Sequence, residues 1–457
     1  MKKELLHTWV PFILCAFIFI FIKLTGMGVR LSDTNIYFLT AEGILSGKVL
    51  YKDIFFTNFP IIPYMASFYF LISGGNLLFY YFTAVIEIII TSGFIYYLSF
   101  KESSSRLVAS SALTLYLYSF MILSTSSHQS GVFLAALFGV LSYFFFKRNN
   151  FYLIGMFTAL ALLTKAYSIP LLFSYLILFS LCNRKALLKF TLGGIITATI
   201  VMVPTILFAA KPFFQDVFMY SLTRTEGVSK LGILYFIIQH DFLFICLLVS
   251  CLAFFRKQLF FGLFAVSSII FFFYYKDVYY LYLNVTLPII VLSFPPINRR
   301  ISEVTVLNRF MIPTIILIFT CYNFFSYFNG YDNLQIIPIK QIVNLLRENK
   351  IKKIYGVNGI SPAISYQARI PLLNNVIDTN DNIFRKGYLN ASSITSDAVQ
   401  KHSAIITVGA WYPELGIKQD IMTEIVDQKQ MKKNCHLLKR FPFHSEGVIN
   451  SINVFSC

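Results

Sequence analysis

Long apolar runs constrain this chain more than any other feature of its sequence. Only 13% of its 457 residues are charged and 57% are hydrophobic, whereas a soluble globular domain has about 25% charged residues. Several runs approach the ~20 residues that a helix needs to cross the hydrocarbon core of a bilayer. We therefore expect an all-α polytopic membrane bundle.

The formal net charge of +17 does not indicate nucleic-acid binding, because the Lys and Arg residues lie in short clusters between apolar runs. Such clusters are typical of cytoplasmic loops under the positive-inside rule. They predict a cytoplasmic amino terminus, held by Lys2 and Lys3, and about eleven transmembrane helices. The apolar piece 59–72 is short for a span, so we expect it to lie on, or dip into, the outer face. In the alternative topology it crosses, and one later hairpin does not.

The composition changes after the last expected span, at about residues 310–328. Strand-like segments then alternate with helix-like ones, including a helix expected over 418–429, which is typical of a small α/β domain. We therefore divide the chain into a transmembrane module, 1–328, whose first outer loop is 30–60, and a C-terminal α/β domain, 329–457. The order of crossings predicts that this domain lies outside the cytoplasm, on the side of the first outer loop.

The seven cysteines are spread thinly, and their spacing matches no metal-ligand motif. Cys435 and Cys457 lie in the polar tail, where an oxidising compartment would allow them to pair, although their spacing does not require it. The tail has no Gly-rich phosphate fingerprint, so we do not interpret it as a nucleotide-binding domain.

The first polar stretch after the first span, residues 31–64, is the strongest candidate for a functional loop. It contains Asp33, Glu42 and Asp53 in a chain with few acids, and a carboxylate at the edge of hydrocarbon is costly to solvate. Asp33 is placed to act as a general base toward a hydroxyl acceptor; alternatively, it caps the following helix. Asp53, near Tyr51, is the second catalytic candidate, and Glu42 is interpreted as a structural acid.

Two basic residues are candidates for binding an anionic group. Lys165 ends an apolar run at its outer end, where its ammonium either extends to the membrane interface or binds a lipid phosphate as a compact charge. Arg224 lies in the outer loop 211–230, and arginine binds phosphate bidentately. The alternative for Arg224 is an ordinary loop of mixed charge.

His128 and Gln129 lie at an outward-facing hairpin tip and are candidates for substrate contact. A lone His is more often structural than catalytic, and no His cluster suggests a metal site. Glu87 lies within a span, where an acid is either functional or satisfied by a hydrogen bond, such as one from a tyrosine.

The first outer loop resembles that of the GT-C glycosyltransferases, in the branch of protein O-mannosyltransferases and lipid A aminoarabinose transferases. The residues that carry this resemblance are Asp33, Tyr37, Ala41, Leu45, Gly47, Tyr51-Lys52-Asp53 and Pro60. The span that ends in Lys165 is similar to a glycine-dotted segment of the family, with Gly155 present and Ala159 at the second glycine. The run SPAISYQARIP is similar to a segment of the family's outer domain and places Arg369 and Pro371.

The resemblance implies a catalytic cavity at the outer face of the bundle and a sugar donor carried on a polyprenyl phosphate. It implies that Asp33 is the general base of an inverting transfer, with Asp53 in support and Lys165 and Arg224 at the phosphate. Further substrate-binding candidates are Tyr37, His128 and Gln129. The first acid is followed by Thr34-Asn35, and His128-Gln129 stands where several members carry another acid. These departures leave open whether a divalent cation or another cofactor is used.

The expected function is that of a glycosyltransferase in the inner (cytoplasmic) membrane, which moves a hexosyl or pentosyl group to a cell-surface glycan, lipid or protein. An O-antigen polymerase or ligase is the alternative, since such enzymes are similar in span count but usually carry their large outer loop between spans. If the protein were a flippase or transporter of lipid-linked sugars, we would expect internal repeats and charged residues near the middle of the membrane. In this sequence only Glu87 lies deep within a span.

Overall fold

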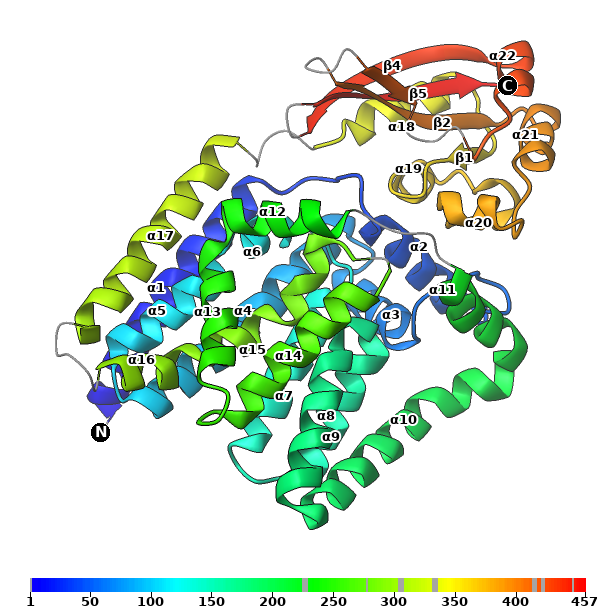
Figure 1. The fold of residues 1–457 in the computed structure, drawn as a ribbon. Helices are drawn as coiled ribbons and strands as arrows, with labels where there is room; N and C mark the ends of the chain where they lie inside the picture. Colours follow the sequence, from blue (N-terminus) through cyan, green and yellow to red (C-terminus); the bar gives the residue numbers. More distant parts are fainter. Residues whose placement is uncertain are drawn as a thin grey trace.

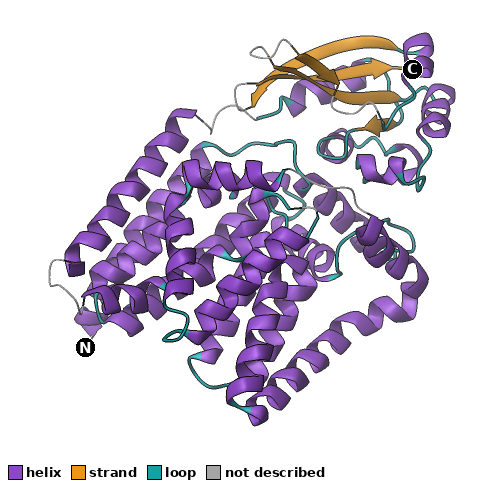
Figure 2. Ribbon diagram, viewed as in Figure 1, coloured by secondary structure: helices purple, strands orange, loops and turns teal. Residues whose placement is uncertain are grey.

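A computed structural model describes residues 2–223, 229–276, 278–302, 308–330, 336–412, 417–420, 424–445 and 448–457. Within these residues the chain is mostly helical, and its strands lie in the C-terminal part (Figure 2). The amino terminus and the C-terminal sheet lie at opposite ends of the molecule (Figure 1).

Twenty helical segments precede residue 331 in the described chain, several of them short. They are α1 (Lys2–Thr25), α2 (Thr34–Leu45), α3 (Ile61–Ser73), α4 (Leu77–Ser103), α5 (Arg106–Leu117), α6 (Phe120–Thr125), α7 (Val132–Phe146), α8 (Phe151–Thr164), η1 (Ala166–Ser168), α9 (Ile169–Cys182), α10 (Arg184–Phe213), η2 (Phe214–Met219), α11 (Tyr220–Thr223), α12 (Lys230–His240), α13 (Phe242–Ala253), α14 (Leu259–Tyr274), η3 (Tyr280–Val285), α15 (Leu287–Val291), α16 (Phe294–Ser302) and α17 (Asn308–Gly330).

Four segments of the described chain are long and apolar enough to cross a membrane: Thr8–Thr25, Leu77–Ser103, Arg184–Leu222 and Phe310–Phe328. A fifth results if α12 and α13, which meet at a bend of 104°, form one span. Shorter apolar helices of 10–17 residues, including α3, accompany them. The protein is therefore a multi-pass membrane protein. The count of eleven spans and the cytoplasmic amino terminus stay predictions.

The long helix α10 is bent near its C-terminal end. Pro204 and Pro212 remove backbone donors, Ala209 has non-helical angles (φ −151°, ψ 35°), and the chain continues as the π-helix η2. Figure 1 shows α10 running diagonally along one side of the bundle and η2 and α11 turning back toward α2 and α20. The bend thus brings residues 214–222 next to the first outer loop.

The helices α8 and α10 cross at a pair of glycines. A Cβ atom on Gly155 would lie 1.9 Å from the carbonyl oxygen of Phe190, and one on Gly193 would lie 2.2 Å from that of Tyr152. Such distances are possible only without side chains, so the backbones of the two helices touch here. This contact gives Gly155 of the glycine-dotted segment a structural role.

Replacing Gly155 by Ala is expected to lower the free energy of unfolding by about 1–3 kcal/mol, because an added methyl group overpacks the crossing. Thermal unfolding of the purified protein in detergent measures this. Gly194→Ala is the matched control, since its Cβ atom would lie at an ordinary 3.5 Å from the carbonyl oxygen of Gly155. Equal melting temperatures for the two variants would contradict the close crossing.

The C-terminal part contains a five-stranded sheet of order β1-β2-β5-β4, with β3 also paired to β2. The β1–β2 pair is parallel and the other pairs are antiparallel. Its elements are α18 (Ile339–Glu348), β1 (Ile354–Gly356), α19 (Ser361–Ala368), η4 (Leu373–Asn375), α20 (Asp381–Arg385), α21 (Ala391–Gln400), β2 (Ala404–Tyr412), β3 (Ile417–Asp420), α22 (Gln428–Asn434), β4 (His436–Ser445) and β5 (Val448–Ser456). The division of the chain at residue 328 stays a prediction.

The helix expected over 418–429 is wrong. Ile417–Asp420 forms β3, which pairs antiparallel with β2 from Gly409 to Tyr412, and the helix begins later, at Gln428. Pairing with a neighbouring strand overrode the weak local helical preference of this polar segment.

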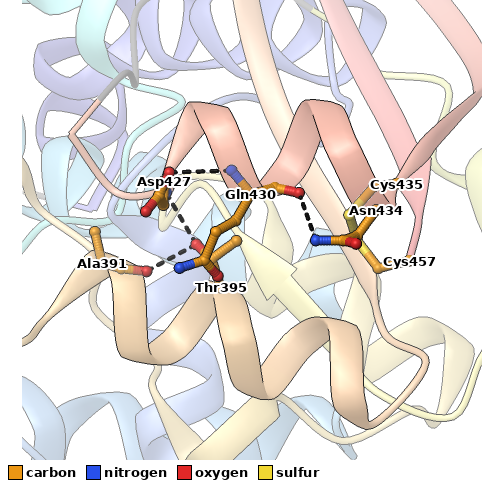
Figure 3. Close-up of a disulfide and its surroundings, with 7 residues drawn as sticks. All are labelled: Ala391, Thr395, Asp427, Gln430, Asn434, Cys435 and Cys457. Carbon is orange, nitrogen blue, oxygen red and sulfur yellow. Dashed lines mark hydrogen bonds between the residues drawn. A yellow bond between two sulfur atoms is a disulfide. The ribbon is translucent and has the colours of Figure 1, made fainter.

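Cys435 and Cys457 form a disulfide. It joins the end of α22 to the carboxyl terminus (Figure 3). On the preceding turn, Asp427 accepts hydrogen bonds from the backbone N–H groups of Lys429 and Gln430 and caps α22. The bond lies next to the paired residues His436 of β4 and Ser456 of β5.

We expect the disulfide to be present in the protein as isolated from the membrane. The SDS-unfolded chain should take up five maleimide adducts before reduction, from the five free cysteines, and seven after reduction. Mass spectrometry counts the adducts. Seven adducts without reduction would show that the two cysteines do not pair in the cell.

The C-terminal part rests directly on the first outer loop. The carbonyl oxygen of Gly359 accepts hydrogen bonds from the backbone N–H of Ser32 (3.0 Å) and the side chain of Asn35 (2.6 Å). Tyr366 donates to the carbonyl oxygen of Gly75 (2.8 Å), which follows α3. The residues on both sides of Asp33 are therefore held by the C-terminal part.

Candidate active site

A cavity of about 610 Å³ lies where the first outer loop, the start of α9, the η2–α11 segment and the C-terminal part meet. Asp33, Tyr37, Asn58 and Lys165 line it from the membrane part. At this volume it falls within the range of pockets that hold small ligands. Three of the predicted site residues, Asp33, Tyr37 and Lys165, thus come together.

Lys165, Asn58 and Tyr37 form a hydrogen-bonded triangle on the cavity wall. The Lys165 ammonium, on a side chain that is 5% exposed, donates to the Asn58 Oδ1 atom (3.2 Å) and the Tyr37 hydroxyl (3.4 Å). The Asn58 amide also donates to that hydroxyl (3.5 Å). The ammonium therefore lies inside the protein, at the cavity wall.

Local structure fixes Asn58. The Tyr51 hydroxyl donates to the carbonyl oxygen of Asn58 (2.7 Å), and the Tyr51 ring packs edge-on against Phe213 of the bent α10. Tyr51 itself has φ 66°, a conformation uncommon for a non-glycine residue. These contacts hold the Asn58 side chain at the cavity.

Asp33 lies immediately before α2, at the position that a helix-capping role would require. Within the described residues 31–45, however, its side chain makes no capping hydrogen bond to the helix, and it is an exposed residue of the cavity lining. Burial raises the pKa of Tyr37 well above its usual range, and the charges of Asp33 and Asp378 raise it further. Tyr37 therefore stays neutral, with the carboxylates of Asp33 and Asp378 near it.

Another part of the cavity lining is apolar and exposed. Phe173, Phe218 and Leu222 line it, and their side chains are 51%, 40% and 75% exposed. They belong to apolar helices, α9 and the segment Arg184–Leu222. The cavity therefore joins a polar, carboxylate- and lysine-bearing end to a membrane-facing apolar end.

Two predicted site residues are not placed in the cavity. Among the described lining residues Asp53 is absent; its carboxylate accepts a hydrogen bond from the backbone N–H of Val49 (2.8 Å) and closes the 49–53 turn. Arg224 lies outside the described residues.

His128 and Gln129 also lie away from the cavity lining as described. The Nδ1 atom of His128 lies 2.8 Å from the Ser32 hydroxyl, beside Asp33. Burial lowers the pKa of His128 to about 4, and the charges of Arg30 and Lys23 lower it further. At neutral pH His128 is uncharged, and it contacts the chain next to Asp33.

Gln129 belongs to a buried polar cluster around Glu87. Its amide donates to Glu87 (3.0 Å) and to Thr83 (2.8 Å), and Tyr69 of α3 donates to the same Glu87 oxygen (2.7 Å). Glu87 therefore accepts a hydrogen bond from a tyrosine of another helix. This hydrogen bond was one of the two interpretations of Glu87 that the sequence allowed. This cluster ties α3 and the 126–131 loop to α4.

Sequence reasoning missed the residues that the C-terminal part contributes to the cavity: Asn358, Asp378 and Asn380. The Asp378 Oδ1 atom accepts hydrogen bonds from the Asn358 side chain and the Asn380 backbone N–H, both at 3.0 Å. The sequence signal that could have indicated them is Asp378 in the run VIDTND, residues 376–381. Read alone, this run resembles an ordinary turn.

No group of three or more His, Cys, Asp or Glu side chains that could hold a metal ion occurs among the described residues. The structure therefore assigns no ligand set for a metal.

No family model and no curated protein sequence matches the chain. Two solved structures have a similar fold: ArnT from Cupriavidus metallidurans in the apo state (TM-score 0.63, 11% identity, 96% of this chain and 97% of that chain covered), and the same protein bound to undecaprenyl phosphate (TM-score 0.60, 12% identity, 97% of each chain covered). The similarity extends over both the helical part and the C-terminal sheet. The chain thus has the fold of a GT-C membrane glycosyltransferase.

Proposed function

We propose that this protein transfers a sugar from a polyprenyl-phosphate carrier to an acceptor outside the cytoplasm, with inversion at the anomeric carbon. The observation that carries the proposal is the single cavity that joins Asp33 and Lys165 to a lipid-facing apolar end. The parts of a polyprenyl-phosphate sugar match this lining: its tail is apolar, its phosphate is anionic and its sugar is polar. The structural neighbour bound to undecaprenyl phosphate supports a donor of this class.

In this proposal Lys165 neutralises the charge that develops on the departing phosphate. Lys165 is buried in the cavity wall, where water screens the interaction weakly. Asn58 and Tyr37 hold the ammonium in place and offer further hydrogen-bonding groups to the phosphate. Arg224, which lies outside the described residues, is retained as a proposed phosphate ligand.

Asp33 takes the proton from the acceptor hydroxyl as that oxygen attacks the anomeric carbon from the side opposite the phosphate. The C–O bond to the phosphate breaks, and the lipid phosphate leaves with its electron pair. A carboxylate that is accessible from the cavity suits this role. Asp53, which closes the 49–53 turn, and His128, which contacts Ser32, support the loop that carries Asp33.

We propose that the C-terminal domain faces the extracytoplasmic side of the inner membrane. The Cys435–Cys457 disulfide supports this, because disulfides persist mainly in oxidising compartments. The proposed donor then approaches from the outer leaflet, through the apolar side of the cavity.

Donor turnover tests the function. The full-length protein in nanodiscs is incubated with a panel of undecaprenyl-phosphate hexoses and pentoses and with solubilised cell-envelope material as acceptor. Release of undecaprenyl phosphate, followed by mass spectrometry, is expected for at least one donor and should require the acceptor fraction. No release from any donor, although the protein binds undecaprenyl phosphate, would favour the alternative of a flippase or transporter.

A further inference from the structure

The cavity has a wall that the transmembrane part does not build. Asn358, Asp378 and Asn380 come from the segments that follow β1 and precede α20, and they face the same space as Asp33 and Lys165. Asp378 also lies near enough to Tyr37 for its charge to raise the pKa of that phenol. The second carboxylate of the site therefore comes from the C-terminal part.

Hydrogen bonds fix this wall relative to Asp33. The Asn358 side chain donates to Asp378, and the next residue, Gly359, accepts from Ser32 and Asn35 on both sides of Asp33. A Cβ atom on Gly359 would lie 3.2 Å from the backbone nitrogen of Ser32, so the approach is close. One short segment thus positions both carboxylates of the cavity.

The chemistry of this wall suits a sugar. Carboxylate and amide side chains accept from and donate to hydroxyl groups, and the pair Asp378 and Asn380 presents both kinds of group. Tyr220 donates to Asn380 (3.5 Å) and brings an aromatic ring to the same side. A phosphate would be repelled by Asp378 and is better bound by Lys165.

We propose that Asp378 is a sugar-binding residue: its carboxylate accepts hydrogen bonds from hydroxyl groups of the transferred sugar, so that the C-terminal domain selects the donor. This inference rests on the proposed function and adds to it which part of the chain recognises the sugar. Asp33 remains the base, and Lys165 remains the phosphate ligand.

The test compares two ligands: undecaprenyl phosphate alone, and the undecaprenyl-phosphate sugar from the panel that wild type binds most tightly. Affinities for the full-length protein in nanodiscs are measured by native mass spectrometry. Asp378→Asn is the variant, because an amide oxygen can still accept from Asn358 and from the Asn380 backbone. It should weaken binding of the sugar-bearing lipid at least 10-fold and change binding of the bare lipid less than 2-fold.

Asp397→Asn is the matched control and should leave both affinities unchanged. Asp397 is also an acid of the C-terminal part that is hydrogen-bonded to an asparagine side chain, Asn374 (2.6 Å), but it lies away from the described cavity lining. Equal weakening of both ligands by Asp378→Asn, or no weakening of either, would overturn the inference and leave the proposed function standing. If wild type binds no sugar-bearing lipid more tightly than the bare lipid, the proposed donor class fails as well.

Discussion

Asp33→Asn is expected to reduce the rate of sugar transfer by about 10²–10⁴-fold, the range that removal of a general base produces. The amide has nearly the same shape as the carboxylate but accepts no proton at neutral pH. Binding of undecaprenyl phosphate should change less than 2-fold, since Lys165, Asn58 and Tyr37 stay in place. The measurement is the maximal rate of undecaprenyl phosphate release from the donor that wild type uses.

Glu42→Gln is the matched control for this prediction. Glu42 is an acid of the same loop and helix, half-buried and outside the described cavity lining. Burial raises the pKa of Glu42, with Lys48 opposing the shift, so neutralising it should have little effect on activity. Transfer by Asp33→Asn at the rate of Glu42→Gln would refute the assignment of Asp33 as the base.

Lys165→Met is expected to weaken binding of undecaprenyl phosphate by about 30-fold or more. Removing one partner of a buried charged pair costs about 2–5 kcal/mol, and 1.4 kcal/mol corresponds to a factor of ten. Binding of undecaprenol, which has the same tail and no phosphate, should change less than 2-fold, because methionine keeps most of the apolar stem. Native mass spectrometry of both ligands with the full-length protein measures the difference.

Lys48→Met is the control, since Lys48 is a lysine of the first outer loop that lies outside the described cavity lining. A loss of undecaprenol binding equal to that of undecaprenyl phosphate would mean that Lys165 supports the shape of the cavity and not the phosphate. Affinity equal to wild type for both ligands would remove Lys165 from the binding site altogether.

Asp33 and Lys165 were found because each lies at the end of an apolar run that hydropathy identifies. Tyr37 joined them through the resemblance of the first outer loop to that of the GT-C glycosyltransferases. His128 and Gln129, which the sequence offered as candidates for substrate contact, lie outside the described cavity lining and contact Ser32 and Glu87. Asp378 and Asn358 were not found because their place in the site depends on how the C-terminal part docks on Ser32 and Asn35. Local pattern carries no information about such long-range contacts.

The same limit applies to the fold. The amphipathic period of residues 339–346 predicts α18, and its apolar positions Ile339, Ile342, Val343 and Leu346 are buried. The bend at Ala209 was not predicted, although Pro204 and Pro212 were visible, because prolines occur in both straight and bent membrane helices. That bend places Phe218 and Leu222 at the cavity.

The position of bound undecaprenyl phosphate in the full-length protein is the most direct test of the proposed donor site. We predict that cryo-electron microscopy in nanodiscs will place a phosphate oxygen about 2.7–3.2 Å from the Lys165 Nζ atom, with the prenyl chain passing between Phe173 and Phe218. A phosphate bound elsewhere on the protein, with the cavity beside Asp33 empty of lipid, would contradict it.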